Sequence, residues 1–195
     1  MTNLSSNFGA NLRKGFKYLN RAMVLAWRLG LGGWGNQAEL SGQIMVLTQT
    51  GRKSGHRRRT PVNYTIFNGD VYCVAGFGAG SDWYRNVTAN PQVEIWLPQG
   101  WWAGLAEDVT GCPEHVHLMR MVMIASGFAA RASGIDPIGM SDDELDAVTS
   151  GYRLVRIRRN TPRTGPGGPG DLAWVWPLAT LFLLPLALRG LGRRR

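Results

Sequence analysis

The sequence contains few cysteines, and its N-terminus lacks a long apolar run. Its 195 residues include two cysteines, Cys73 and Cys112, which lie far apart and form no C-x-x-C pair. No stretch near the N-terminus has the uninterrupted apolar region of a secretory signal peptide. Disulfides are rare in reducing compartments, so these two absences favour a cytoplasmic setting.

Arrangements typical of hydrolases, metal sites and dinucleotide-binding folds are also missing. No serine, cysteine and histidine pattern resembles an activated nucleophile, and Glu107 and Asp108 lie on opposite faces of a predicted strand. His115 and His117 are two residues apart in a predicted helix, so they point to different faces and do not predict a metal site. The glycine run at 76–80 is one residue shorter than G-x-G-x-x-G.

The positive charge lies mainly in the two ends of the chain. The formal net charge is +9, from 22 Lys and Arg residues against 13 Asp and Glu residues. Residues 1–42 and 161–195 each carry +4, which leaves +1 for residues 43–160. A nucleic-acid-binding domain is usually basic over its own folded surface, whereas basic ends suit an anionic membrane surface. We therefore expect a membrane surface, and no nucleic acid, as a partner.

The central region predicts about six strands with helices between pairs of them. The predicted strands are residues 43–50, 59–67, 71–77, 92–97, 101–109 and 152–159. Asn68-Gly69 predicts a tight hairpin, and helices are predicted at 81–90, at 113–134 and after the capping box that begins at Ser141. Hairpins and short crossovers favour an α+β fold. We predict a split β-barrel of mostly antiparallel strands rather than a doubly wound parallel sheet.

Both ends add elements to this barrel. Apolar residues at spacings of three and four along 12–29 predict a basic amphipathic helix, either docked on the domain or lying on a membrane. A Pro/Gly linker with no core to bury then precedes residues 172–188, which carry no charge. Two prolines and arginines on both sides favour an interfacial or re-entrant anchor over a single span or packing on protein. The predicted regions are 1–42, 43–160 and 161–195.

The segment TGRKSGHRRRTP, residues 50–61, crowds five cations and a histidine between two predicted strands. Its glycines allow backbone N–H groups to converge on an anion, and the planar fork of arginine suits phosphate and carboxylate groups. The segment therefore predicts an anion-binding loop, and a solvated hairpin tip is the alternative.

Three stretches of the chain resemble one known family. They are LTQTGRKSGHRRRTPV (47–62), GDVYCVAG (69–76) and DWYRNVTANPQVEIWL (82–97). In order and separation they resemble the T-G-R-[KR]-[ST]-G-x-x-R-x-x-P and W-Y-x-N-[LV]-x-A-N-P motifs of the deazaflavin-dependent nitroreductases, split-barrel enzymes that use coenzyme F420. The resemblance runs from about residue 43 to residue 159. It implies an F420H2-dependent oxidoreductase that transfers a hydride to a quinone- or nitro-type acceptor.

The resemblance also implies which residues bind the cofactor. Those expected to hold its phosphate and acidic tail are Arg52, Lys53 and Ser54. Those expected to line the same groove are Arg58, Arg59, Thr60, Pro61, Val62 and Asn63. Those expected to offer backbone to the deazaflavin ring are Ala75, Gly76, Phe77 and Gly78. Those expected to close the site from a helix start, with an aromatic wall at its centre, are Asp82, Trp83, Tyr84, Arg85 and Asn86.

The remaining expectations concern the reaction and its partners. The cofactor carries the hydride, so the protein mainly orients donor and acceptor, and a proton comes from water or a hydroxyl group. The candidate proton donors are Tyr64, Ser81 and Tyr152. We expect a cytoplasmic, peripherally membrane-associated enzyme with a lipophilic quinone-like substrate, no metal, and a homodimer as one option. The alternatives are an FMN-binding split-barrel protein and a non-catalytic module that binds polyanions or membranes.

Overall fold

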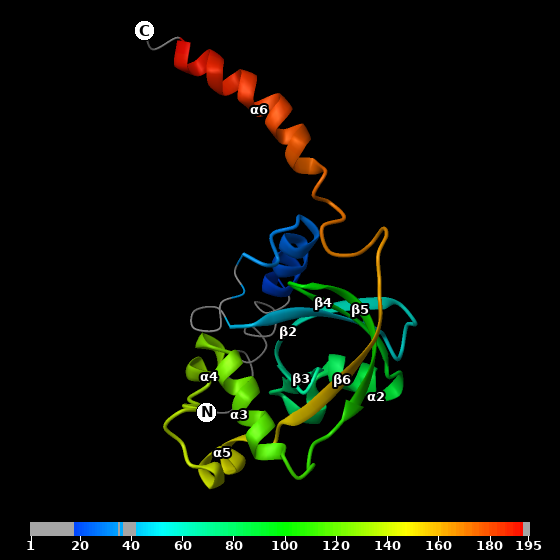
Figure 1. Cartoon of the computed structure of the whole chain (residues 1–195), viewed down its shortest axis with the longest axis vertical. Coiled ribbons are helices and arrows are strands. Elements are labelled where there is room, and N and C mark those ends of the chain that lie inside the picture. Colours follow the sequence, from blue (N-terminus) through cyan, green and yellow to red (C-terminus); the bar gives the residue numbers. More distant parts are fainter. Residues whose placement is uncertain (1–17, 35, 37–41, 193–195) are drawn as a thin grey trace, which may run out of the picture.

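The protein is built around a closed barrel of six antiparallel strands in the order β1-β2-β3-β6-β5-β4 (Figure 1). The computed structural model describes residues 18–34, 36 and 42–192. The strands are β1 (Ile44–Thr50), β2 (Arg57–Phe67), β3 (Asp70–Ala75), β4 (Gln92–Leu97), β5 (Gly100–Asp108) and β6 (Arg153–Pro162). The predicted α+β split barrel with inserted helices is confirmed.

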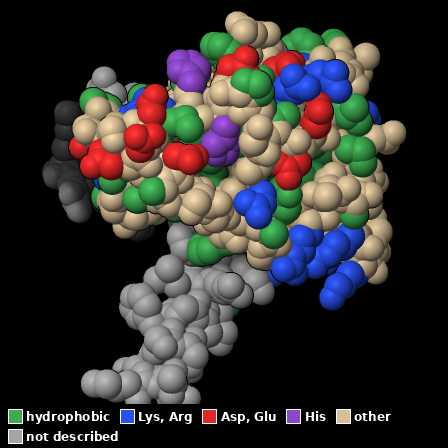
Figure 2. Space-filling model, turned by 90° about the horizontal axis from the view of Figure 1, so that it is seen from below, with side chains coloured by type: hydrophobic (Ala, Val, Ile, Leu, Met, Phe, Trp, Pro, Cys, Tyr) green, Lys and Arg blue, Asp and Glu red, His purple; other side chains and the backbone are tan. Residues whose placement is uncertain are grey.

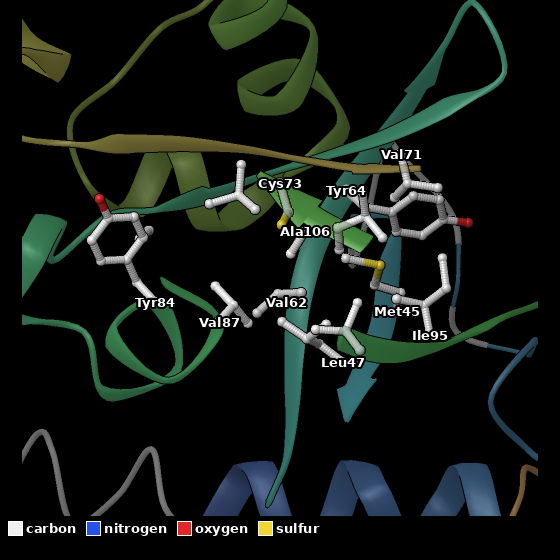
Figure 3. Packing of buried hydrophobic residues seen from close by; sticks show 14 of the residues in the cluster. Met45, Leu47, Val62, Tyr64, Val71, Cys73, Tyr84, Val87, Ile95 and Ala106 are labelled. Atoms are coloured by element: carbon white, nitrogen blue, oxygen red, sulfur yellow. The ribbon is translucent and has the colours of Figure 1, made fainter. Parts of the chain in front are cut away.

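The interior of the barrel is filled by apolar side chains from alternate positions of the strands. Met45 and Leu47 of β1, and Val71, Cys73 and Ala75 of β3, belong to this core. Figure 3 shows such side chains converging from several strands toward the middle of the barrel. Alternation follows from the period of two along a strand, and burial of this apolar surface is the main favourable contribution to folding. The pattern that predicts the strands is therefore the pattern that fills the barrel.

Two hairpin connections set the register of the first three strands. Between β2 and β3, Asn68 and Gly69 have φ values of 50° and 86°, as a type I′ turn requires, so the predicted tight hairpin is confirmed. Between β1 and β2, the last pair is Thr50 with Arg57, which leaves a connection of residues 51–56. β2 thus begins two residues earlier than its apolar pattern predicts, because its first arginines also pair with β1.

Helices lie between the strand pairs and pack on the outside of the barrel. They are the one-turn η1 (Gly78–Gly80), α2 (Asp82–Ala89), α3 (His115–Ala125), α4 (Phe128–Ala132) and α5 (Asp142–Thr149). The predicted helical segment 113–134 is divided at Gly127, whose φ of 54° interrupts it. At the start of α5, Ser141 and Glu144 form both hydrogen bonds of the predicted capping box.

The N-terminal helix (residues 18–28) is docked on the outer wall of the barrel. Trp27 is only 6% exposed. The residues that pack with it in one apolar cluster are Val24, Val46, Trp96 and Trp101. The first part of the predicted helix, residues 12–17, lies outside the described residues.

The segment after β6 crosses the same wall and leads into α6 (Val175–Gly192), which extends away from the barrel (Figure 1). Composition predicts a linker here with nothing to bury, but the segment makes specific contacts. Gly168 packs against the ring of Trp101, and Asp171 forms an ion pair with Arg28. Among the described residues, none of the helices is both long enough and apolar enough to cross a membrane.

The face of the molecule opposite α6 carries acidic and basic side chains in separate small groups (Figure 2). Several of the charged side chains of the described barrel and its helices are paired. Arg156 lies 2.7 Å from Glu107, and Arg120 lies 2.8 Å from Asp142. Paired charges of this kind agree with the nearly neutral sum for the central region, and they contrast with the cation-rich groove described next.

Candidate functional site

The connection between β1 and β2 folds back on itself through its two glycines. The N–H of Gly51 donates to the carbonyl of His56 at 2.8 Å, and the N–H of Gly55 donates to the carbonyl of Gly51 at 2.8 Å. Gly55 has a φ of +67°, a conformation that L side chains rarely adopt. The tight loop carries Arg52 and Lys53 at its tip, and the side chain of Arg52 is 24% exposed.

Asn86 of α2 holds this loop against the helix. Its Oδ1 accepts a hydrogen bond from the backbone N–H of Arg52 at 3.1 Å and another from Arg52 Nη1 at 3.2 Å. The same guanidinium lies 3.2 Å from Asp82 Oδ1 at the start of the helix. Asn86 is 6% exposed, so its buried amide connects the β1–β2 loop to α2. The two motifs that are separate in the sequence therefore meet in space.

A groove of about 830 Å³ lies between this loop, the start of α2 and the N-terminal helix. Its charged lining residues are five cations and one acid: Arg21, Arg52, Lys53, Arg58, Arg59 and Asp82. Its other lining residues are Asn20, Val24, Gln49, Gly51, Ser54, Thr60, Trp83 and Asn86. Arginine forks, amides and hydroxyl groups suit phosphate and carboxylate oxygens, and the lining also includes an indole and a valine, which suit a flat apolar ring.

Gln49 and Thr60 link the two hairpin strands where the groove meets the barrel. The side chain of Gln49 is 3% exposed, and its amide lies 3.0 Å from Thr60 Oγ1. With the amide oriented to satisfy every neighbour, it accepts from Thr60 and donates to the carbonyls of Leu47 at 2.8 Å and Arg58 at 3.0 Å. These hydrogen bonds fix β1 and β2 to each other below the groove, and so fix the positions of Arg58 and Arg59 next to Thr60.

Arg59 is shared between the groove and the C-terminal segment. Its guanidinium lies 4.8 Å from the centroid of the Trp96 ring, and its Nη2 donates to the carbonyl of Gly167 at 2.6 Å. Burial lowers the pKa of Arg59, and the nearby charges of Arg28 and Arg57 lower it further. An opposite charge favours the charged form of a buried group, so an anion in the groove would stabilise this guanidinium.

Comparison with known proteins assigns the family. The profile of the F420H(2)-dependent quinone reductases matches residues 19–141, more than half of the chain. The chain belongs to this family. Coenzyme F420 is accordingly the cofactor of this enzyme, and quinone reduction is the activity for which the family is named. The excess of cations in the groove fits a cofactor that carries a phosphodiester and carboxylates.

Solved structures resemble this F420H2-dependent reductase loosely. An F420-H2-dependent reductase is 25% identical over 60% of this chain and 93% of its own, with a TM-score of 0.43. A structure described as a domain-swapped dimer is 26% identical over 60% and 79%, with a TM-score of 0.43. A conserved protein from Mycobacterium tuberculosis is 21% identical over 66% and 86%, with a TM-score of 0.44. No protein with a curated description matches the chain.

The predicted cofactor-binding residues of the reductase fall into two groups. Those that line the groove are Arg52, Lys53, Ser54, Arg58, Arg59, Thr60, Asp82, Trp83 and Asn86. Those that do not line it are Pro61, Val62, Asn63, Ala75, Gly76, Phe77, Gly78, Tyr84 and Arg85. The cations expected to bind the acidic tail of the cofactor therefore line one groove. The residues expected to contact the deazaflavin ring, from Ala75 to Gly78, do not line it.

Several of the second group face other parts of the protein. The side chains of Val62 and Ala75 belong to the barrel core. Trp83 faces the groove, whereas Tyr84 is buried and donates its hydroxyl to Asp108, and this hydrogen bond raises the pKa of Tyr84. The expected aromatic wall is therefore a single tryptophan.

In the glycine run at 76–80, Gly76 and Gly78 pack on the two residues before β6 rather than on the groove. Gly78 has a φ of +54°, and a Cβ at this position would lie 2.1 Å from the carbonyl oxygen of Gly151. A Cβ at Gly76 would lie 3.8 Å from the ring of Tyr152. The resemblance implies that Gly76 and Gly78 offer backbone to the deazaflavin ring, but contact with the chain itself explains Gly78.

Among the described residues, the three candidate proton donors lie outside the groove. Tyr64 is 3% exposed in the barrel core, and burial raises its pKa. Ser81 precedes α2, and its buried hydroxyl has no hydrogen-bond partner within the described chain. Tyr152 packs on the apolar cluster of α3 and α5. The hydroxyl groups that line the groove are those of Ser54 and Thr60.

Sequence reasoning missed the contribution of the N-terminal helix. The groove residues outside the predicted set are Asn20, Arg21, Val24, Gln49 and Gly51. The helical residues share one face, since positions 20 and 24 are one turn apart. The basic, amphipathic pattern of this helix was the available signal, but a local pattern does not say which surface the helix covers.

Arg57 points away from the groove, to a second hollow of about 420 Å³ on the outer wall. There it forms an ion pair with Glu94, whose carboxylate also lies 3.4 Å from Arg163 Nε. The indole N–H of Trp101 donates to the same carboxylate at 3.2 Å. The charge of Arg57 is therefore paired outside the groove, whereas that of Arg52 is paired with Asp82 within it.

The two histidines of α3 have different neighbours. His115 Nε2 lies 3.8 Å from Asp146, whereas the ring of His117 packs edge-on against Phe67 with centroids 5.6 Å apart. Within the part of the chain that the structure describes, no three His, Cys, Asp or Glu side chains are grouped as a metal ion would need.

Proposed function

We propose that the groove between the β1–β2 loop, α2 and the N-terminal helix is the coenzyme F420 site. The observation that carries this proposal is the lining itself, in which five cations face a single carboxylate. Arg52 and Lys53 at the loop tip would bind the phosphate and carboxylate groups, and Arg58 would bind from the strand. Trp83 and Val24 would contact the deazaflavin ring, because they are the apolar side chains of the lining.

In this arrangement the chain contributes binding and orientation rather than acid–base chemistry. Reduced F420, when bound, supplies the hydride that a quinone-type acceptor receives. Trp83 and Val24 would exclude water from the ring, and the cations would hold the anionic tail. The proton that completes quinone reduction comes from water or from the hydroxyl groups of Ser54 or Thr60, the hydroxyl groups of the described groove.

Binding of F420 to the purified protein, followed by fluorescence, tests the proposal. The double variant Arg52→Ala/Lys53→Ala should weaken binding about 10- to 100-fold, since hydrogen bonds to charged groups contribute about 1.5–3 kcal/mol before solvent screening. The matched control is Arg131→Ala, which removes an exposed arginine of α4 and should leave affinity unchanged. Unchanged affinity in the double variant would show that the loop is a solvated tip. A parallel titration with FMN distinguishes an FMN-binding protein.

We further propose that α6 holds the enzyme at an anionic lipid surface, where a lipophilic quinone would be available. Its large apolar side chains are uncovered: Leu181 is 66% exposed and Phe182 is 67% exposed. A shallow apolar groove of Trp176, Pro177, Thr180, Leu181, Leu184 and Pro185 runs along it. The helix is apolar on several sides, and arginines follow it in the sequence, which suits lipid better than a single protein groove.

Cosedimentation with lipid vesicles tests the role of α6. The full chain should bind vesicles that contain anionic lipid, and a chain without residues 175–195 should remain in the supernatant. Leu181→Glu/Phe182→Glu should show the same loss with the helix retained. If the shortened chain still sediments with vesicles, α6 is not the anchor and the N-terminal helix becomes the candidate. A homodimer stays a prediction, which equilibrium sedimentation can test.

A further inference from the structure

The segment 163–174, which we call the strap, is fixed to the barrel wall. The N–H of Arg163 donates to the carbonyl of Trp101 at 2.8 Å. Gly168 lies so close to the same tryptophan that a Cβ would meet its ring at 2.5 Å. Arg59 of the groove donates to the carbonyl of Gly167 at 2.6 Å. The strap therefore has a defined path in spite of its Pro/Gly composition.

The strap also binds the C-terminal end of the N-terminal helix. The N–H of Gly170 donates to the carbonyl of Trp27 at 2.9 Å, and the N–H of Leu172 donates to the carbonyl of Arg28 at 2.9 Å. Just beyond the strap, the indole N–H of Trp176 donates to the carbonyl of Leu29 at 2.8 Å. The last carbonyls of a helix have no partner within the helix, so these donors cap it from outside.

An ion pair completes this contact. Arg28 Nη2 lies 2.8 Å from Asp171 Oδ2, and Arg28 Nε lies 2.9 Å from Asp171 Oδ1, which is a bidentate arrangement. The carboxylate is the better covered partner, with 12% of the side chain of Asp171 exposed against 33% for Arg28. Bidentate pairs fix orientation as well as distance, so the pair sets how the helix lies on the wall.

The helix has few other attachments. Trp27 is its one fully buried apolar side chain among the described residues, and Leu19 and Leu25 are 54% and 49% exposed. Helices of about this length are marginal in water without tertiary packing. The position of Arg21 and Val24 in the groove therefore depends on Trp27 and on the strap.

We propose that the strap, through Asp171, holds the N-terminal helix in place as the third wall of the groove and so sets the affinity for the anionic cofactor. Asp171 is a positioning residue, because it lines no part of the groove and acts through Arg28 on the helix that carries Arg21 and Val24. The inference deepens the proposed F420 site and rests on it. Nothing in the family profile covers the strap, since the match ends at residue 141.

The first test uses the full chain without cofactor. Hydrogen exchange of amides in the N-terminal helix should become about ten-fold faster in Asp171→Ala, as expected for easier local opening, while the barrel strands keep their protection. Asp142→Ala is the matched control, because it removes an ion pair of the same 2.8 Å length with Arg120 on another face. The exchanged pair Arg28→Asp/Asp171→Arg should restore slow exchange. Unchanged exchange in Asp171→Ala would overturn the proposal.

The second test measures F420 affinity in the same variants. Asp171→Ala should bind about 5- to 10-fold more weakly, which is the low end of coupling between separate sites, and the exchanged pair should recover the affinity. Equal affinity of Asp171→Ala and the unaltered protein would refute the link between strap and groove. If the unaltered protein itself fails to bind F420, the proposed cofactor site is wrong, and the exchange experiment still decides whether the strap holds the helix.

Discussion

Replacement of Asn86 separates the effect of the shape of the β1–β2 loop from the effect of its charge. In Asn86→Ala, the backbone N–H of Arg52 loses an acceptor that lies 3.1 Å away at a buried position. The bond is partly buried, and loss of such a hydrogen bond costs about 0.5–1.5 kcal/mol. At roughly 2–4 °C per kcal/mol for a domain of this size, the melting temperature should fall by about 1–6 °C. The loop should also leave α2, which weakens F420 binding.

Asn86→Asp keeps the acceptor and changes only the charge. A carboxylate at this position still accepts from the N–H and the guanidinium of Arg52, so the loop should keep its place with a small change in stability. The added negative charge would oppose an anionic ligand, so F420 affinity should fall while the melting temperature is nearly retained. Asn160→Ala, an exposed asparagine of the other hollow, is the control.

Thermal unfolding and F420 titration of the three variants give the decisive comparison. The reasoning predicts loss of both stability and affinity in Asn86→Ala, and loss of affinity alone in Asn86→Asp. If Asn86→Ala unfolds at the temperature of the unaltered protein and binds F420 equally well, Asn86 does not hold the loop. If Asn86→Asp binds F420 as tightly as the unaltered protein, the cationic side of the groove does not carry the ligand.

Three further predictions concern the cysteines and the C-terminal segment. Burial raises the pKa of Cys73 to about 12, so a thiol reagent should modify Cys112 first and reach Cys73 only on unfolding. The hydrogen bond from Arg28 lowers the pKa of Asp171 below its ordinary value. The stabilisation from this pair is therefore full above the ordinary pKa and is lost as the pH falls through the lowered pKa, which hydrogen exchange of the N-terminal helix can follow. Removal of residues 175–195 should leave F420 affinity nearly intact, whereas removal of 163–195 should reduce it, as the same titration will show.

The barrel was predictable because its determinants are local. Alternating apolar residues specify strands, and the φ values of Asn68 and Gly69 confirm the hairpin that the Asn-Gly pair predicts. The capping box at Ser141 is likewise confirmed by its two hydrogen bonds. In these cases, the sequence pattern and the structure are related within a few residues, so no knowledge of distant contacts was needed.

The residues of the candidate site were predicted less completely than the barrel. A residue reaches the groove only if its side chain also points there, and the sequence motif does not specify this direction. Thr60 and Val62 point to the same face of β2, but Thr60 lies nearer the loop and lines the groove, whereas Val62 lies further along the strand and belongs to the barrel core. In α2, Trp83 and Tyr84 are neighbours in sequence, but successive helical residues point about 100° apart, and Tyr84 is buried. A motif identifies the segment that forms a site, whereas the distance along the strand and the helical turn decide which of its side chains reach the groove.

The fixed path of the strap could not be predicted from its local sequence. Its proline and glycine content predicts a flexible linker, because such residues form neither helix nor strand and have little apolar surface to bury. In the structure its fixed path depends on partners more than a hundred residues away, Arg59 for Gly167 and Arg28 for Asp171. Backbone groups that lack partners in a helix or sheet must find them elsewhere, and here the last turn of the N-terminal helix supplies them. The C-terminal segment, whose end the composition predicts to lie at a membrane, is therefore also tied to the helix that forms one wall of the groove, through one carboxylate and two backbone N–H groups.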